Sequence, residues 1–312
     1  MRVIRGLPAS ADAPVALTIG NFDGVHRGHQ AMLARLIEGA EDLRLTPAVL
    51  TFDPHPREFF APGNAPPRVS SIRARLEAFR TLGVGRTIVA RFDRRLASLS
   101  AEAFIRDVLE GALNAHWVLV GDDFRFGKGR AGDLAMLRAH ARKFSVEGMR
   151  TVEIGTERAS SSAVRASSSA VRAALAAGDL ARAKALLGRS YTISGRVAHG
   201  DKLGRDLGFP TANLPLRRPP PLAGIFAVRV HGLGGTPRAG VASVGVRPTV
   251  KSDDKPLLEV FIFDFDQPIY GRRIAVEFLH KLRDEARYPD LAALTQQIRT
   301  DAEQARAYFA AH

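Results

Sequence analysis

Cysteine is absent from all 312 residues of the chain. That absence excludes disulfide scaffolds, thiolate zinc sites and cysteine nucleophiles, and it suits a reducing compartment. Long apolar runs are absent as well, because no stretch approaches the ~18 residues that a membrane-spanning helix needs. The first residues lack the apolar core of a secretory signal. We therefore expect a cytoplasmic protein with no membrane partner.

Aromatic residues are scarce, at 7% of the chain, and no run of them is spaced for stacking on nucleic-acid bases. The net charge is +13, but no block of five like charges gathers it into one patch. A nucleic-acid-binding protein is expected to concentrate such charge. Diffuse positive charge suits small anionic substrates instead, so we expect no nucleic-acid partner.

The length suits two domains of ~150 residues each. In the first half, short apolar strands alternate with amphipathic helices. Strands are expected at 15–19, 48–52, 87–92 and 116–120, and helices at 28–43, 71–82, 101–110 and 133–143. This alternation predicts an α/β domain whose parallel sheet is covered on both faces. Such sheets bind ligands at the carboxyl ends of their strands.

Two more helices, at 167–177 and 179–187, precede a change of pattern. Strands without intervening helices are then expected at 191–198, 225–231, 241–246, 257–265 and 273–280. A final helix at about 290–311 has Leu291, Leu294, Ile298 and Phe309 on its apolar side. The second half is therefore expected to be an antiparallel barrel or sandwich. The predicted domains are residues 1–187 and 188–312.

The segment Gly20–His29, GNFDGVHRGH, directly follows the first strand and opens a helix. Glycines allow the backbone to approach a ligand closely, and a helix N-terminus attracts phosphate. His26 and His29 are three residues apart, so both imidazoles can lie on one helix face. A turn with two surface histidines is the simpler interpretation, but the strand–turn–helix context favours a phosphate site.

Further motifs follow later strands. Residues 51–56 (TFDPHP) end the second strand, and residues 121–127 (GDDFRFG) end a later one. The heptad ASSSAVR then occurs twice in tandem, at 159–165 and 166–172. Its hydroxyls, the free amides of the following helix and an arginine again suit phosphate.

In the second half, residues 199–213 (HGDKLGRDLGFPTAN) place glycines at 200, 204 and 208. This is not a P-loop, because the GxxxxGK[ST] pattern is missing. Lys202, Thr211 and Asn213 add a charge, a hydroxyl and an amide, which suit nucleotide phosphates and Mg²⁺. A long flexible hairpin loop fits this segment equally well.

In this order, GNFDGVHRGH, TFDPHP, GDDFRFG and SSSAVR resemble the bacterial bifunctional riboflavin kinase/FMN adenylyltransferases (FAD synthetases). The run at 200–213 and the segments at 224–226, 245–249, 258–260 and 270–279 resemble the riboflavin kinase module of that family. The resemblance covers about residues 15 to 310. It implies an α/β fold class: a Rossmann-like nucleotidyltransferase domain followed by an antiparallel β-barrel kinase domain.

The resemblance also implies an enzyme that binds riboflavin, FMN, FAD and ATP. It would phosphorylate riboflavin to FMN and adenylylate FMN to FAD, releasing pyrophosphate, with ATP as co-substrate and Mg²⁺ as cofactor. In the first domain it assigns His26 and His29 to catalysis at the ATP phosphates. Its other ATP contacts are Gly20, Phe22, Asp23, Ser168, Ser169 and Arg172, and its flavin and nucleotide contacts are Phe52, Pro54, Pro56 and Asp123.

For the kinase domain, the resemblance makes Glu277 the general base for the riboflavin 5′-hydroxyl, a role that needs a carboxylate within hydrogen-bond reach. On the strand pattern alone, Glu277 is an ordinary outward-facing residue. The resemblance implies that ATP and Mg²⁺ bind at Gly200, Lys202, Gly208, Thr211 and Asn213, with Thr211 and Asn213 on the metal, and that Arg283 contacts the flavin. The chain departs from the family at Ser243, where Asn is frequent, and at Phe261, where His is frequent.

Two alternatives stay open. Only one copy of the duplicated heptad can meet the triphosphate, and we favour the second, Ser167–Arg172, because the following helix anchors it. If the duplication spoils the adenylylation site, the chain is a riboflavin kinase alone. The other alternative is a basic nucleic-acid-binding protein with vestigial nucleotide sites, which the scarcity of aromatics disfavours.

Overall fold

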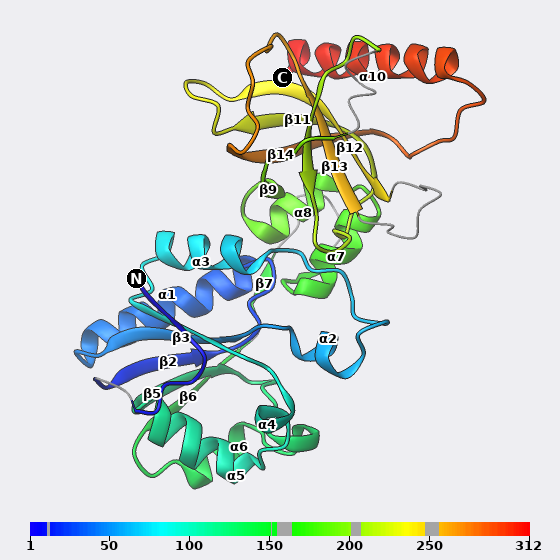
Figure 1. Ribbon diagram of the computed structural model, residues 1–312. Helices are drawn as coiled ribbons and strands as arrows, with labels where there is room; N and C mark the ends of the chain where they lie inside the picture. The colour runs from blue at the N-terminus through cyan, green and yellow to red at the C-terminus, as the bar shows by residue number, and fades with distance from the viewer. Residues whose placement is uncertain (11–12, 151, 155–163, 201–206, 247–255) are drawn as a thin grey trace. The chain divides into compact units, whose positions relative to one another are not determined.

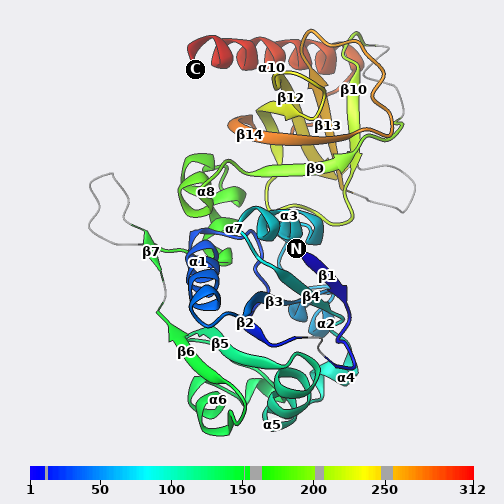
Figure 2. The ribbon, with the colours of Figure 1, turned by 90° about the vertical axis from the view of Figure 1, so that its left-hand side faces the viewer.

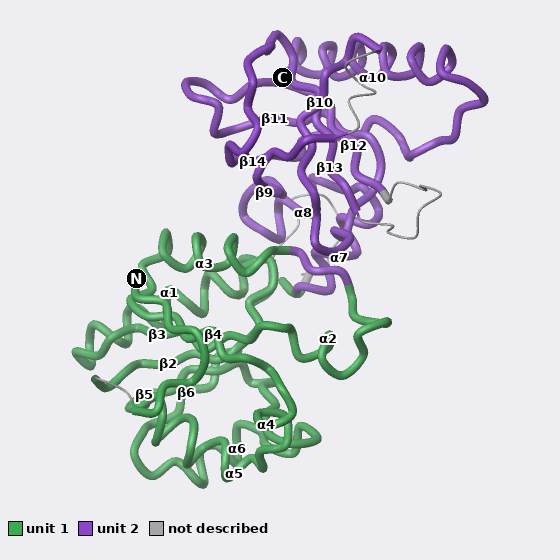
Figure 3. The backbone as a smooth tube through the Cα atoms, viewed as in Figure 1, with its two compact units in different colours: residues 1–66, 70–167 green, residues 67–69, 168–312 purple. Residues whose placement is uncertain are grey.

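The chain forms two compact units, coloured separately in Figure 3. The first unit comprises residues 1–66 and 70–167, and the second comprises residues 67–69 and 168–312. The computed structural model describes residues 1–10, 13–150, 152–154, 164–200, 207–246 and 256–312. Contacts therefore divide the chain after Ser167, whereas the sequence pattern places the domain boundary after residue 187.

The first unit is built on a six-stranded sheet in the order β1-β4-β3-β2-β5-β6, in which every pair is parallel. Its strands are β1 (Arg2–Arg5), β2 (Val15–Ile19), β3 (Thr46–Phe52), β4 (Arg86–Ala90), β5 (Ala115–Gly121) and β6 (Ser145–Met149). A separate antiparallel pair joins β7 (Glu153–Ile154) to β8 (Val164–Arg165). The predicted parallel α/β sheet is confirmed, with β1 and β6 as edge strands that the pattern did not predict.

Helices cover both faces of this sheet (Figures 1 and 2). On one face, α1 (Arg27–Asp42) and α3 (Ile72–Thr81) bury Leu33, Leu36 and Phe79 at helical spacing. On the other lie α4 (Arg94–Ala97), α5 (Ala101–Ala103) with its π-helical continuation η1 (Phe104–Ala112), and α6 (Leu134–His140). Two short elements, α2 (Pro56–Phe60) and η2 (Lys128–Arg130), lie in connections after β3 and β5.

The second unit is an antiparallel sheet in the order β10-β13-β12-β11-β14-β9. Its strands are β9 (Thr192–Arg196), β10 (Thr211–Pro215), β11 (Gly224–His231), β12 (Arg238–Val246), β13 (Pro256–Ile262) and β14 (Arg273–Arg283). An antiparallel bridge between Ala198 and Asn213 links the chain after β9 to β10, so the two edges of the sheet meet. The predicted antiparallel barrel is confirmed in this form.

Among the described residues of the second unit, the helices are α7 (Ser168–Ala176), α8 (Leu180–Leu187) and α10 (Leu291–Ala311). Asp179 caps α8 by accepting the Arg182 N–H (2.9 Å), and Gly188 ends it with φ of +73°. In Figures 1 and 2, α10 lies over β11 and β12, which it contacts. Among the described residues, no helix is both long and apolar enough to span a bilayer.

The predicted apolar side of α10 is not buried along its whole length. Leu291 is 56% exposed, and the residues that α10 buries are Asp301, Ala302 and Ala305. Leu291 and Ala302 are about three turns apart at 3.6 residues per turn, so they share a face. The exposure of Leu291 therefore comes from its position in the first turn of the helix and not from its direction.

Candidate active sites

A strained turn joins β2 to α1 and carries the first motif. Phe22 and Val25 have φ of +50° and +43°, in the left-handed region that non-glycine residues rarely adopt, and Gly24 between them has φ of +83°. Such strain gathers at ligand-binding sites, where the surrounding structure holds it. The turn places His26 at the N-cap of α1, where its Nδ1 accepts the His29 N–H (3.4 Å).

The two histidines lie together at this helix N-terminus. Their rings stack with centroids 3.6 Å apart, and His26 is 5% exposed. The Nδ1 atom of His29 is buried without a hydrogen-bond partner among the described residues. Burial of the ring, and then the charges of His26 and Arg75, lower the pKa of His29 well below its ordinary value. His29 is therefore neutral at pH 7, with one ring nitrogen protonated and the other an acceptor.

Three residues predicted to contact ATP have structural contacts inside the turn. Phe22 is 1% exposed and packs edge-on against Phe79 with ring centroids 5.4 Å apart. A Cβ on Gly20 would come within 3.1 Å of the Phe22 ring. The Asp23 carboxylate accepts hydrogen bonds from the Ser70 N–H (2.9 Å) and hydroxyl (3.3 Å). The side chains of Phe22 and Asp23 thus stabilise the turn from within.

The other strand-end motifs reach the same edge of the sheet. Phe52 closes β3, and Pro54 and Pro56 follow it after a cis Asp53–Pro54 peptide. Asp123 follows β5. Because β3 and β5 flank β2 and run parallel to it, their carboxyl ends lie beside the turn that leads to His26.

An aromatic cluster at this edge was missed by the sequence prediction. Phe92 packs edge-to-face against Phe52, Phe59 and Phe60, with ring centroids 5.7, 5.5 and 5.7 Å away. Phe60 remains 67% exposed, so the cluster presents an open aromatic face. The signal was two consecutive phenylalanines shortly after TFDPHP in a chain poor in aromatics.

The two ASSSAVR copies take different conformations. In the first copy, Val164 and Arg165 form β8, and Arg165 makes an ion pair with Asp123. Residues 159–163 of that copy lie outside the described residues. The second copy opens α7, with Ser168 and Ser169 in its first turn.

Contacts at either end of the second copy are also defined. The carbonyl of its first residue, Ala166, lies 3.2 Å from where a Cβ on Gly28 would stand, so the second copy begins beside the His26–His29 turn. At its last residue, the Arg172 Nε donates to the carbonyl of Pro67 (2.9 Å).

In the second unit, the side chain of Asn213 is buried and lies close to the backbone of Gly200. It is 7% exposed, its Nδ2 donates to the Thr211 carbonyl (3.3 Å), and its Oδ1 is buried without a partner among the described residues. A Cβ on Gly200 would come within 2.5 Å of the Asn213 amide, so only glycine fits there. Gly208 has φ of +85°. The predicted nucleotide residue Lys202 lies outside the described residues.

A row of polar side chains crosses the sheet at Asn213. Asn213 of β10 pairs with Glu259 of β13, and Glu259 pairs with Ser243 of β12, so the three side chains share one face. The Ser243 hydroxyl lies 3.4 Å from the Glu285 carboxylate, and burial together with the charge of Glu259 raises the pKa of Glu285. Glu259 was not predicted as a site residue, although its segment was among those that resemble the kinase module.

Glu277 does not lie with this row. On one side of the row, Ser243 pairs with Ile225 of β11, and Ile225 pairs with Arg283 of β14. Arg283 is six residues from Glu277 along β14. On the other side, Asn213 pairs with Ala198, which is six residues from Thr192, and Thr192 pairs with Glu277. At ~3.3 Å per residue, both routes separate Glu277 from the row by about 20 Å along the strands.

Glu277 also has partners of its own. Its Oε2 lies 2.8 Å from His231 Nε2. Although burial raises it, hydrogen bonds from His231 and Ser190 hold the pKa of Glu277 below its ordinary value. The prediction of Glu277 as general base thus lacks geometric support, because strand register separates it from Thr211 and Asn213.

Arg283, predicted to contact the flavin, ties β14 to α10. Its guanidinium forms two hydrogen bonds, of 2.8 and 2.6 Å, with the carboxylate of Asp301, which is 3% exposed. These bonds raise the pKa of Arg283. The side chain therefore stabilises the helix–sheet contact next to the polar row.

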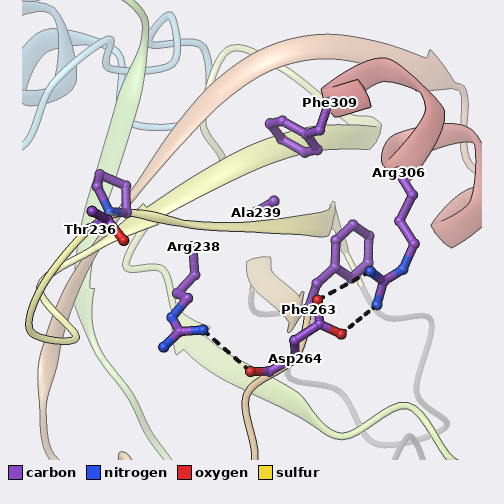
Figure 4. Close-up of a pocket in the computed structure, with 8 residues that line it drawn as sticks. Thr236, Arg238, Ala239, Phe263, Asp264, Arg306 and Phe309 are labelled. Atoms are coloured by element: carbon purple, nitrogen blue, oxygen red, sulfur yellow. Dashed lines mark hydrogen bonds and ion pairs between the residues drawn. The ribbon is translucent and has the colours of Figure 1, made fainter. Parts of the chain in front are cut away.

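A pocket of about 370 Å³ lies elsewhere on the barrel (Figure 4). Its lining residues are Thr236, Pro237, Arg238, Ala239, Phe263, Asp264, Arg306 and Phe309. Arg306 forms bonds of 2.9 and 3.2 Å to Asp264 and lies 4.2 Å from the centroid of the Phe263 ring. Phe263 is four residues beyond Glu259, or about 13 Å in an extended chain, so the pocket is separate from the polar row.

Comparison with known proteins identifies two family models that match the chain. The FAD synthetase model matches residues 9–163, and the riboflavin kinase model matches residues 187–309. The bifunctional riboflavin kinase/FMN adenylyltransferase of Escherichia coli strain K12 is 45% identical over 99% of this chain and 98% of its own. The Haemophilus influenzae enzyme is 45% identical over 99% of both chains, and the Pseudomonas fluorescens enzyme is 46% identical over 99% and 98%.

A solved structure also matches the chain. The crystal structure of a macrolide-efflux protein from Streptococcus pneumoniae superposes with a TM-score of 0.80 at 28% identity. The match covers 98% of this chain and 99% of that one, so the two share their fold throughout.

Proposed function

We propose two successive ATP-dependent reactions for this chain, which belongs to the family of bifunctional riboflavin kinase/FMN adenylyltransferases. The second unit phosphorylates riboflavin to FMN, and the first adenylylates FMN to FAD with release of pyrophosphate. The observation that carries the proposal is the match of both family models to a chain 45% identical, over nearly its full length, to enzymes named for both activities. We assign the reactions to the cytoplasm, where ATP is supplied and a chain without cysteine needs no oxidising environment.

For adenylylation, we assign the triphosphate to the N-terminus of α1 in the first unit. Free helix amides and the positive end of the helix dipole favour phosphate. A neutral His29 donates a hydrogen bond to phosphate from its protonated ring nitrogen without the cost of a buried charge. Ser168, Ser169 and Arg172 stay predicted ATP contacts from the resemblance alone, and their hydroxyls and guanidinium suit phosphate. FMN attacks the α-phosphorus directly, so the site acts by positioning the reactants and neutralising charge.

We assign the flavin of this reaction to the aromatic cluster at the end of β3. Phe52, Phe59, Phe60 and Phe92 offer a partly open aromatic face next to Pro54 and Pro56. Offset or edge-on contacts between aromatic rings contribute about 0.5–1.5 kcal/mol beyond the apolar area that they bury. The isoalloxazine ring of FMN is an aromatic ligand of this kind.

For phosphorylation, we assign Mg²⁺ and the nucleotide phosphates to Thr211 and Asn213. The buried Oδ1 of Asn213 is an oxygen ligand with no protein partner among the described residues, which fits a hard cation. The described residues of the chain contain no cluster of three or more His, Asp or Glu side chains suited to a metal ion. That absence suits Mg²⁺, which commonly takes few protein ligands and completes its shell with phosphates and water. When bound, Mg²⁺ neutralises charge on the phosphates.

We further propose Glu259 as the general base of the kinase, in place of Glu277. Glu259 is in register with Asn213, so its carboxylate stands next to the assigned metal ligand. A general base has to lie within hydrogen-bond reach of the hydroxyl that it deprotonates. Glu277 is paired with His231 and is separated from this row by about 20 Å along the strands.

The test is a set of full-length proteins incubated with Mg²⁺, ATP and either riboflavin or FMN, followed by chromatographic separation of the flavins. Wild type is expected to make FMN from riboflavin and FAD from FMN. His29→Ala should stop FAD formation and leave FMN formation intact. Glu259→Gln should lower FMN formation by ~10²–10⁴-fold and leave FAD formation from supplied FMN.

Glu277→Gln is the matched control, since it makes the same change elsewhere on the same sheet. Loss of FMN formation in Glu277→Gln but not in Glu259→Gln would return the role of base to Glu277. Equal loss of both reactions in any one variant would contradict the division of labour. A wild type that makes FMN but no FAD would leave only the kinase, the alternative raised by the duplicated heptad.

A further inference from the structure

Arg75 is a buried cation that the sequence pattern did not single out. It lies in the first turns of α3, is 2% exposed, and is among the largest fully buried side chains of the chain. Arginine is almost never buried to this degree unless its guanidinium is engaged. Its contacts therefore indicate what the side chain does.

The guanidinium holds one backbone carbonyl of the β2–α1 turn. Its Nη1 donates to the carbonyl of Asn21 (2.5 Å) and to the Thr51 hydroxyl oxygen (3.1 Å). The same Thr51 hydroxyl donates to the Asn21 carbonyl (3.3 Å). Two donors thus converge on Asn21, whose own side-chain Oδ1 is buried without a partner among the described residues.

The segment that opens α3 holds the turn at a second point. Ser70 donates to Asp23 through its N–H and hydroxyl, and its hydroxyl accepts the Gly24 N–H (2.8 Å). Arg75 and Ser70 therefore fix the turn on both sides of Phe22, whose φ is +50°. Strained backbone persists only where its surroundings over-determine it.

We propose that Arg75 is a positioning residue for adenylyl transfer: it holds the Asn21 carbonyl, and with it the turn that presents His26 and His29, and it adds a fixed positive charge behind the phosphate subsite. The inference rests on the proposed function of the first unit. The effect of the Arg75 charge has separate support. It lowers the pKa of His29, although less than burial and the charge of His26 do. A buried charge is screened far less by salt than a surface charge.

The experiment compares full-length Arg75→Met and Arg75→Lys with wild type. Methionine keeps much of the side-chain volume but lacks the charge and the N–H donors of the guanidinium. Lysine keeps the charge. Arg75→Met is expected to lower kcat/KM for FAD formation by about 10²-fold, the scale of a 1 Å misplacement at a reacting site. It should also raise the His29 imidazole pKa measured by NMR. Arg75→Lys should keep that pKa low and recover part of the activity.

Two controls are built into the chain. FMN formation from riboflavin belongs to the other unit and should not change in either variant. Arg73→Met removes an arginine two residues earlier whose side chain is 62% exposed, and it should change neither FAD formation nor the His29 pKa.

FAD formation within a few-fold of wild type in Arg75→Met would overturn the proposal. So would a loss of activity with an unchanged His29 pKa and no recovery in Arg75→Lys, which would mean a purely structural role. If Arg75→Met fails to fold, as reported by the fluorescence of Trp117, then Arg75→Lys decides through its His29 pKa and kinetics. If wild type makes no FAD, the proposed function fails, and the His29 pKa still tests the charge of Arg75.

Discussion

Two buried polar atoms, His29 Nδ1 in the first unit and Asn213 Oδ1 in the second, have no hydrogen-bond partner among the described residues. An unsatisfied buried group costs about 1–3 kcal/mol of folding free energy. At Asn213 the oxygen lone pairs suit a cation. At His29 the unsatisfied atom belongs to a ring whose charged form burial already disfavours. In both places a polar group is held ready for a ligand at the expense of stability.

The lowered pKa of His29 predicts a pH-dependent stability of the first unit. In the unfolded chain His29 titrates near its ordinary value of ~6.5, whereas in the folded chain it stays neutral to a lower pH. As the pH falls below 6.5 the unfolded state binds the additional proton, so stability falls by at most about 1.4 kcal/mol per pH unit until the folded pKa is reached. His29→Asn should lack this part of the loss between pH 7 and pH 5.

The measurement is urea unfolding followed by the fluorescence of Trp117, the single tryptophan, which is 6% exposed in the first unit. The free-energy difference between wild type and His29→Asn should change with pH in the stated direction. His116→Asn, at an exposed position, serves as the control substitution. A difference between wild type and His29→Asn that stays constant from pH 7 to pH 5 would mean that His29 titrates alike in both states.

At each site, the sequence indicated residues within recognisable motifs, and the structure added residues brought in by distant elements. His26 and His29 stand in a strand–turn–helix pattern, so local spacing was enough to indicate them. Arg75 was missed because a single arginine in a helix pattern suggests a solvent-facing side chain, and only the β2–α1 turn packed over it makes it buried. Glu259 was missed because strand register, which sets it beside Asn213, is a property of the folded sheet.

At the scale of elements, strands were predicted best where burial on both faces leaves a continuous apolar run. β2 is buried at all five positions, and its predicted bounds are those observed. β10 (TANLP) was missed because it is short and has a polar residue at alternate positions. β1 (RVIR) was missed because an edge strand with charged ends lacks an apolar run.

The duplicated heptad is an element-scale question that the structure narrows. The first copy does not extend α7, because α7 begins at Ser168 and residues 164–165 are in β8. We therefore expect the second copy to serve the triphosphate. Arg172→Ala should cripple FAD formation, while Arg165→Ala should cost little, because its ion pair with Asp123 is half-exposed and contributes at most about 1 kcal/mol.

The assay is FAD formation from supplied FMN, with FMN formation from riboflavin as the control in the same chain. Excision of residues 159–165 should preserve FAD formation, because it removes only the first copy. Loss of activity in Arg165→Ala with none in Arg172→Ala would assign the site to the first copy. Equal tolerance of both changes would show that neither arginine is essential or that each replaces the other.

At the scale of the whole molecule, the two units have separate sheets, and the proposed kinase site lies within the second unit. The contacts group α7 and α8 with the barrel, and α8 contacts β14. The turn between these helices is also close to β14, because a Cβ on Gly178 would overlap the side chain of Lys281. The predicted domain boundary at 187/188 would detach both helices from the barrel.

Two fragments separate these boundaries and test whether the kinase is an independent unit. We expect residues 188–312 to fold and convert riboflavin to FMN, because they contain the whole antiparallel sheet and α10. Residues 168–312 should do the same with a higher urea midpoint, because they retain the buried Leu180, Leu186 and Leu187 of α8. If only the longer fragment is soluble and active, the functional boundary lies at Ser167. If neither fragment makes FMN while the full chain does, the kinase site depends on the first unit, and the assignment of one reaction to each unit is wrong.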